Sequence, residues 1–143
     1  MRRYLRIRRI ALKYKELSEI KEILIKLSGN KKPLNLLYFK YKKVTAGRDI
    51  RRFLNYIRLY EVIFERSLNM LECPFDKKVT ELLCKEGLGI KKTADCLYVS
   101  ESTVERAFKR FVMYFYNNLN SSNRIIDSLS QIKKLWKKLA IGI

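Results

Sequence analysis

The chain has 143 residues, 48% of them apolar, so it can fill one hydrophobic core, either as a single domain or as a small domain with an appended arm. Its 32 Lys and Arg against 14 Asp and Glu give a formal charge of +18, and this favours a polyanionic partner, first nucleic acid and second an anionic membrane surface. The lack of histidine removes the commonest general base, and no apolar run approaches the roughly 20 residues of a membrane span.

The positive charge is concentrated in the N-terminal part. Residues 1–58 hold 18 Lys and Arg against four acidic residues, a net charge of +14, whereas residues 59–143 hold 14 against 10, a net charge of +4. Drift in an AT-rich genome explains lysines better than it explains a cluster of arginines. We expect such a cluster to form a phosphate-contacting arm. Its members are Arg2, Arg3, Arg6, Arg8 and Arg9.

The cysteines and acidic residues do not have the spacing of a metal or catalytic site. Cys73, Cys84 and Cys96 are too far apart for a C-x-x-C motif, and no histidine can complete a zinc site. An odd number of cysteines without a secretion signal indicates reduced thiols in a cytoplasmic protein. The aspartates fall on separate helices or caps, and they are Asp49, Asp76, Asp95 and Asp127. We therefore expect no enzyme, no metal and no cofactor.

Residues 4–28 are predicted to form one helix, with a basic stripe on its first turns. Ser28-Gly29-Asn30 is a typical C-terminal stop signal. The apolar residues that recur at helical spacing are Leu17, Ile20, Ile23, Leu24 and Leu27. The apolar face is long enough to be core, so we do not expect the helix to lie on a membrane surface.

Residues 31–43, KKPLNLLYFKYKK, fit a short strand or a helix, and the conformation of residues 31–48 stays open. Aromatic side chains interleaved with lysines suit stacking on unpaired bases. A half-buried segment with solvated lysines is the commoner origin of this pattern.

Two further helices are predicted before the most informative stretch. A long helix begins at Asp49 and ends at Cys73-Pro74, with a broad apolar stripe along one side. A shorter amphipathic helix over about 75–86 follows, with Val79, Leu82 and Leu83 facing inward. Gly87 stands where a left-handed C-cap is needed.

Two helices over about 90–97 and 101–118, joined by a tight turn, have the features of a helix-turn-helix. Ala94 allows close packing of the first helix on the second, and Ser100 supplies the N-cap of the second helix. Leu97 and Val99 flank the turn and fix the angle between the helices. The inward face of the second helix is predicted to consist of Val104, Ala107, Phe108, Phe111 and Phe115.

The outward face of the second helix carries side chains that can read bases in a major groove. Arg106 suits guanine, Glu101 or Glu105 can accept from cytosine, and Ser102 can contact several bases. At the start of the first helix, basic side chains and unpaired backbone amides can contact DNA phosphates. The expected DNA-binding residues are Lys91, Lys92, Thr93, Ser100, Glu101, Ser102, Thr103, Glu105, Arg106, Lys109 and Arg110. The alternative is a helical hairpin whose basic face meets only water.

Residues 76–112, DKKVTELLCKEGLGIKKTADCLYVSESTVERAFKRFV, resemble the helix-turn-helix of sigma factor region four. In that family a helix ends in a G-L linker, a short helix follows, and V-S-x-S-T-V opens the recognition helix. The matching positions are Gly87, Leu88, Ile90, Ala94, Leu97, Val99, Ser100, Thr103, Val104 and Arg110. Tyr98 departs from the usual glycine, and because a left-handed tyrosine costs about 1 kcal/mol or more, we expect a turn of slightly different shape.

The whole layout resembles small phage transcriptional activators of the RinA/ArpU type, which are basic proteins of similar length. In these proteins a long helix, here IRRFLNYIRLYEVIFERSLNML, leads into a region-four-like motif. The resemblance implies a bacterial or phage-encoded protein that binds double-stranded DNA near a promoter and recruits RNA polymerase. The predicted helix after residue 121 has no clear place in that pattern.

A final helix is predicted over about 124–140, after the polar stretch NNLNSSN. It can fold onto the core or pair with a second copy, so a homodimer remains an alternative to a monomer. The residues on its apolar side are Ile125, Ile126, Leu129, Ile132, Leu135, Trp136 and Leu139.

Together these patterns predict an all-α, multi-helix bundle that contains a helix-turn-helix with flanking N- and C-terminal amphipathic helices. The expected parts are a basic N-terminal arm over 1–48, a helical domain over 49–120 and a C-terminal helix over 121–143. The predicted function is a sequence-specific DNA-binding transcription regulator, with the helix from Glu101 in the major groove. The alternative is a DNA-packaging or assembly protein similar to a phage terminase small subunit, because such proteins also combine a helix-turn-helix with helical oligomerisation segments.

Overall fold

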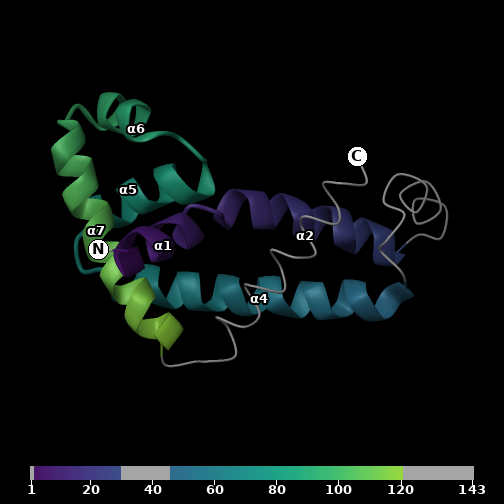
Figure 1. Ribbon diagram of the computed structural model, residues 1–143. Helices are drawn as coiled ribbons and strands as arrows, with labels where there is room; N and C mark the ends of the chain where they lie inside the picture. The colour runs from purple at the N-terminus through teal and green to yellow at the C-terminus, as the bar shows by residue number, and fades with distance from the viewer. Residues whose placement is uncertain (1, 30–45, 121–143) are drawn as a thin grey trace. The chain divides into compact units, whose positions relative to one another are not determined.

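The computed structural model describes residues 2–29 and 46–120 of the chain (Figure 1). Within these ranges the chain is helical and contains no strand, so the predicted all-α, multi-helix fold is confirmed. The segments predicted over 31–43 and 124–140 lie outside the described residues. The helices are α1 (Arg2–Ala11), α2 (Tyr14–Gly29), α4 (Ala46–Met70), α5 (Pro74–Thr80), the π-helix η1 (Glu81–Lys85), α6 (Ile90–Leu97) and α7 (Glu101–Asn120). No helix of the described ranges is both long enough and apolar enough to cross a membrane.

The chain divides into two compact units. One unit combines residues 1–16 with residues 61–121 and contains the predicted helix-turn-helix, and we call it the motif unit. The other combines residues 17–60 with residues 122–143. The sequence had placed boundaries after residues 48 and 120, whereas the first 16 residues share a compact unit with the motif.

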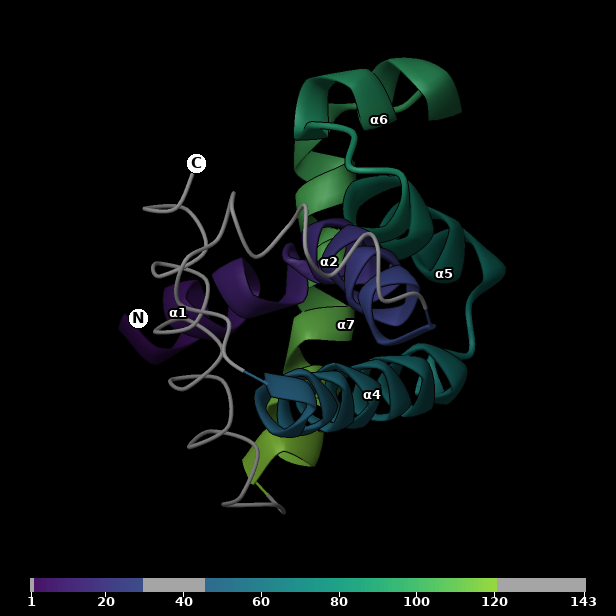
Figure 2. The same cartoon turned by 90° about the vertical axis from the view of Figure 1, so that its right-hand side faces the viewer.

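The second unit is described through α2 and the first part of α4. These two helices lie side by side in both ribbon views (Figures 1 and 2). Each buries one apolar face at helical spacing. The apolar pattern of α2 in the sequence also included Ile23, but this residue is 45% exposed. The buried residues are Leu17, Ile20 and Leu24 of α2, and Leu54, Ile57 and Tyr60 of α4.

The single helix predicted over residues 4–28 is wrong, because a turn at Leu12-Lys13 separates α1 from α2. The amide of Leu12 donates to the carbonyl of Arg8 at 3.1 Å, and that of Lys13 donates to Ile10 at 3.2 Å. No glycine or proline causes the break. The residues before and after the turn make their own packing contacts. Ala11 is fully buried, and the ring centroid of Tyr14 lies 4.5 Å from that of Phe64.

The helix predicted over 75–86 also has two parts, α5 and the π-helix η1. The amide of Glu86 donates to the carbonyl of Glu81 at 3.0 Å, five residues back, which is the π pattern. This wider winding turns three successive residues inward, and they are Leu82, Leu83 and Cys84. Gly87 then takes a φ of 70°, as the sequence predicted, and a Cβ there would lie 2.8 Å from Cδ of Lys15.

The core of the motif unit is built around α7, against which α1, α5 and α6 pack (Figure 2). Its centre is a group of phenylalanine rings. The ring centroids of Phe64 and Phe111 lie 4.8 Å apart, and those of Phe111 and Phe115 lie 5.6 Å apart. Each of these rings is fully buried, and burial of one such side chain contributes about 1.5–3 kcal/mol. The side-chain Nδ2 of Asn118 donates to the buried hydroxyl of Ser67 at 2.8 Å, which fixes α4 against α7.

Candidate nucleic-acid interface

Helices α6 and α7 form the two arms of the predicted helix-turn-helix, and their bounds at the turn agree with the sequence prediction. Ala94 is buried against α7, as expected of the small residue in the first helix. The amide of Val99 donates to the carbonyl of Ala94 at 3.1 Å and closes the C-terminal end of α6. The second helix follows after only three residues.

Tyr98 occupies the turn in the left-handed conformation, with φ 56° and ψ 44°. The backbone of this tyrosine therefore adopts the left-handed conformation that glycine favours. For a residue with a Cβ this conformation costs about 1–2 kcal/mol. The tyrosine side chain is 94% exposed, so little packing within the described residues offsets that cost.

Ser100 is the N-cap of α7, as predicted. Its hydroxyl oxygen accepts a hydrogen bond from the amide of Thr103 at 3.2 Å, and its carbonyl accepts from the amide of Val104 at 3.2 Å. The hydroxyls of Ser100 and Thr103 lie 2.8 Å apart. The first turn of α7 is thus fixed by the residues that the sequence motif placed there.

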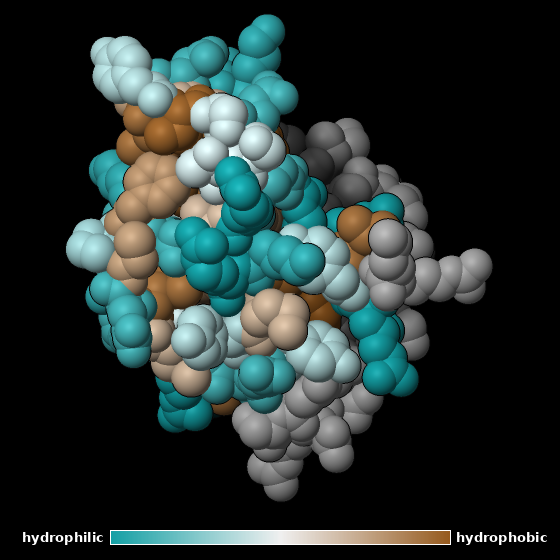
Figure 3. Space-filling model, turned by 90° about the vertical axis from the view of Figure 1, so that its left-hand side faces the viewer, coloured by the Kyte–Doolittle hydropathy of each residue, from teal (hydrophilic) through white to brown (hydrophobic). Residues whose placement is uncertain are grey.

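Helix α7 has the two faces that its sequence predicted. The inward face is fully buried, and it consists of Val104, Ala107, Phe108, Phe111 and Phe115. The exposed residues of the opposite face are Glu101, Ser102, Arg106, Lys109 and Met113. Seen from the left of Figure 1, both hydrophilic and hydrophobic side chains lie at the upper end of the motif unit, where α6 lies (Figure 3).

The start of α6 exposes two of the three residues expected to contact phosphates. Lys91 and Lys92 are exposed, and the N-cap residue Gly89 provides no side-chain hydrogen bond to the first-turn amides. Those amides and the positive end of the helix dipole favour an anion. Thr93 is fully buried, and its hydroxyl has no hydrogen-bond partner among the described residues. A phosphate contact through the Thr93 hydroxyl is therefore contradicted by its burial.

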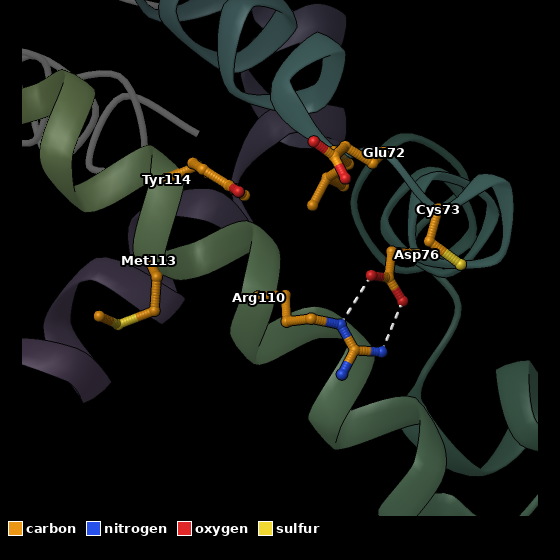
Figure 4. Close-up of a pocket in the computed structure, with 7 residues that line it drawn as sticks. Glu72, Cys73, Asp76, Arg110, Met113 and Tyr114 are labelled. Carbon is orange, nitrogen blue, oxygen red and sulfur yellow. Dashed lines mark hydrogen bonds and ion pairs between the residues drawn. The ribbon is translucent and has the colours of Figure 1, made fainter.

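Arg110 was expected to bind DNA, but it is engaged within the fold. Its Nε and Nη2 atoms donate to the two carboxylate oxygens of Asp76, each at 2.7 Å (Figure 4). The Asp76 side chain is 5% exposed, and these hydrogen bonds raise the pKa of Arg110. The expectation for Arg110 is corrected, because its guanidinium holds α5 against α7.

A groove of about 520 Å³ borders this ion pair, between α7 and the connection from α4 to α5. Glu72, Cys73, Met113 and Tyr114 contribute to its lining (Figure 4). Among the described residues no cluster of three His, Cys, Asp or Glu side chains can hold a metal ion. The groove therefore presents the carboxylate of Glu72, one thiol, one phenol and apolar surface beside the Asp76–Arg110 ion pair, rather than a set of metal ligands.

Helix α1 packs on the flank of α7 instead of forming a separate arm. Ile7 and Ala11 are buried, and Arg8 Nη2 lies 3.0 Å from Glu105 Oε1. Arg8 is thus removed from the expected set of phosphate contacts. Of the other arginines in that set, Arg3, Arg6 and Arg9 are exposed, and the side chain of Arg2 is not described.

A second contact between α1 and α7 involves a cation and an aromatic ring. Nζ of Lys109 lies 5.9 Å from the centroid of the Tyr4 ring, and burial raises the pKa of Tyr4. Neither Tyr4 nor Asp76 was predicted to influence the site. No local pattern identifies them, because their partners on α7 are 105 and 34 residues away along the chain.

No protein-family model, no curated protein and no solved structure matches the chain. The arguments for its function therefore come from the geometry of α1, α6 and α7. That geometry brings Lys91, Lys92, the exposed face of α7 and the exposed arginines of α1 into one compact unit.

Proposed function

We propose that the protein is a sequence-specific double-stranded DNA-binding regulator of transcription, and that the first turns of α7 enter the major groove. One observation carries this proposal. The left-handed Tyr98 and the Ser100 cap join α6 to α7 so that the N-terminal end of α7 presents an exposed polar face. Helix-turn-helix proteins read base edges with this end of their second helix.

The exposed face of α7 carries chemistry that distinguishes base pairs. Arg106 has no acidic partner among the described residues, so its guanidinium is available for the O6 and N7 acceptors of guanine. Ser102 can donate or accept, and Glu101 can accept from the amino group of cytosine. These side chains are one to five residues apart on the first turns of a single helix.

Phosphate contacts would come from two other helices of the motif unit. Lys91 and Lys92 project from the start of α6, where the first-turn amides are also open to an anion. Arg3, Arg6 and Arg9 are exposed on α1. Such contacts position a protein on the duplex and increase its affinity without carrying sequence information.

The direct test is to select bound fragments from a pool of random DNA duplexes with the full chain. We expect a defined consensus sequence. Arg106→Ala should then weaken binding by about 1–3 kcal/mol and relax the preference at one base pair. Lys91→Ala should weaken binding to all sequences by a similar factor. Lys78→Ala, at an exposed position on α5, is the matched control for the loss of one positive charge.

The outcome of this selection also separates the two candidate functions. Binding without any enriched sequence would contradict the proposed regulator and favour the DNA-packaging or assembly protein. An equal effect of Arg106→Ala on every sequence would remove Arg106 from base recognition.

The proposal extends to recruitment of RNA polymerase, which the resemblance to small phage activators implies, and to a homodimer formed through the predicted C-terminal helix. Co-purification of RNA polymerase with the chain on its selected DNA tests the first. Sedimentation of the full chain and of a chain ending at Asn120 tests the second. A dimer that persists in the shortened chain would exclude residues 121–143 as the dimer contact.

A further inference from the structure

We propose that Arg8 is a positioning residue for base recognition, which neutralises and orients Glu105 so that its carboxylate can accept a hydrogen bond from a cytosine amino group. This inference rests on the proposed function of α7. It assigns Arg8 a role in the choice of sequence rather than in phosphate binding.

The Arg8–Glu105 ion pair leaves one carboxylate oxygen of Glu105 available for another hydrogen bond. Arg8 Nη2 donates to Oε1 of Glu105 at 3.0 Å, and within the described residues no hydrogen bond engages Oε2. The Glu105 side chain is 45% exposed, and that of Arg8 is 22% exposed. The arginine thus lies mostly inside the α1–α7 contact, while the carboxylate reaches the surface.

The position of Arg8 is fixed by more than its ion pair. Its Cζ atom lies 5.6 Å from the centroid of the fully buried Phe108 ring, and a guanidinium over an aromatic face is favourable. Ile7 and Ala11 of the same helix are buried within the motif unit. A side chain held in this way limits the rotamers that Glu105 can adopt.

The positive charge of Arg8 affects how Glu105 can approach DNA. Glu105 lies four residues after Glu101 and one residue before Arg106, at the edge of the face proposed to enter the groove. An unpaired carboxylate there would be repelled by the phosphates. The nearby guanidinium offsets this repulsion and leaves one oxygen as an acceptor, and cytosine N4 is the donor that Glu recognises in the major groove.

The pair can be tested by a double-mutant cycle on the selected DNA site and on sites with each base pair changed in turn. Arg8→Met keeps an unbranched side chain over Phe108 and removes the charge, and Glu105→Gln removes the other charge. We expect each variant to lower the preference for a C·G pair at the same single position by about tenfold. The double variant should lose little more than either single variant, because the two residues act through one contact.

Two further variants separate this role from phosphate binding and from a purely structural contact between α1 and α7. Arg9→Met, at an exposed position next to Arg8, should weaken binding to all sites equally. Arg8→Lys should restore part of the preference, since it retains the charge but not the planar fork. If Arg8→Met fails to fold in a thermal melt, then Glu105→Gln and Arg8→Lys still carry the test.

The inference and the proposed function can fail separately. A wild-type chain that selects no consensus would overturn both. A consensus whose base preferences survive Glu105→Gln, or an equal loss at all sites in Arg8→Met, would overturn the inference and leave the regulator intact. Additive losses in the double variant would likewise show that Arg8 acts independently of Glu105.

Discussion

The carboxylate of Asp76 receives two hydrogen bonds from the guanidinium of Arg110, both 2.7 Å long, and so joins the first turn of α5 to α7. Two parallel N–H to oxygen bonds fix both distance and orientation, which a lysine could not do. The carboxylate is nearly inaccessible to water, whereas the Arg110 side chain is 56% exposed. Loss of the arginine would therefore leave an uncompensated buried charge.

Removing this ion pair should destabilise the motif unit. We expect Arg110→Met to lower the free energy of unfolding by about 2–3 kcal/mol, which is less than for a fully buried pair because the guanidinium reaches solvent. Urea denaturation followed by circular dichroism measures the difference. Arg106→Met, on the exposed face of the same helix, is the control and should change stability by less than about 0.5 kcal/mol. Equal stability of the two variants would show that the ion pair does not stabilise the unit.

The N-cap of α7 should be detectable in the same assay. Ser100→Ala removes the oxygen that accepts the amide hydrogen bond of Thr103, and we expect a loss of about 1 kcal/mol. Ser102→Ala, two residues later and exposed, should have a much smaller effect. A Ser102→Ala loss as large as that of Ser100→Ala would contradict the assignment of the cap.

The left-handed conformation of Tyr98 predicts a stabilising substitution. Tyr98→Gly removes the steric cost of the positive φ, and after allowance for the larger entropy of an unfolded glycine we expect a gain of about 0.5 kcal/mol. Tyr98→Ala removes the ring but keeps a Cβ, so it should give no such gain. Thermal melts of both variants measure the difference. Melting temperatures that rise equally in both would place the effect in the exposed ring rather than in the backbone.

Stability should decrease at alkaline pH because the buried thiol of Cys84 and the partly buried phenol of Tyr14 hold their protons in the folded state. Burial raises the pKa of the Cys84 thiol from 9.0 to about 12. Burial, with the carboxylates of Glu65 and Glu61, raises that of the Tyr14 phenol from 10.0 to about 12. Between pH 9 and pH 12 the unfolded chain therefore binds fewer protons than the folded chain. Their contribution to stability is complete below pH 9 and is lost as the pH rises toward 12.

Urea midpoints at pH 8 and pH 10.5 measure this alkaline loss. Cys84→Ala should make the loss smaller, although the variant starts from a lower stability because it leaves a cavity. Cys96→Ala, at an exposed position, is the matched control and should leave the pH dependence unchanged. If Cys84→Ala loses as much stability between the two pH values as the wild type, the buried thiol does not contribute.

The features that the sequence predicted correctly depend on local patterns. The bounds of α6 and α7 at their turn, the Ser100 cap and the buried row from Val104 to Phe115 follow from spacing within one helix or one turn. The positive φ of Gly87 was predicted in the same way, because it follows a helical apolar pattern.

The features that the sequence missed depend on distant partners. The turn at Leu12-Lys13 contains no helix breaker, and the π-helix shows no residue that distinguishes it from a regular helix. The partners of Arg8 and Arg110 are 97 and 34 residues away, so both arginines looked like free surface cations. Thr93 was assigned to the surface from its position near a helix start, but the face that carries it is buried.

These ion pairs bear on how binding to a polyanion would respond to salt. Each phosphate that a protein neutralises on duplex DNA releases condensed counterions, and the logarithm of affinity falls with that of salt concentration by about 0.9 per phosphate. Arg8, Arg110 and Lys85 already neutralise acids of their own chain. The slope should therefore follow the exposed cations of α1, α6 and α7 rather than the full set of 32 Lys and Arg residues. A protein this basic would then be less sensitive to ionic strength than its composition indicates.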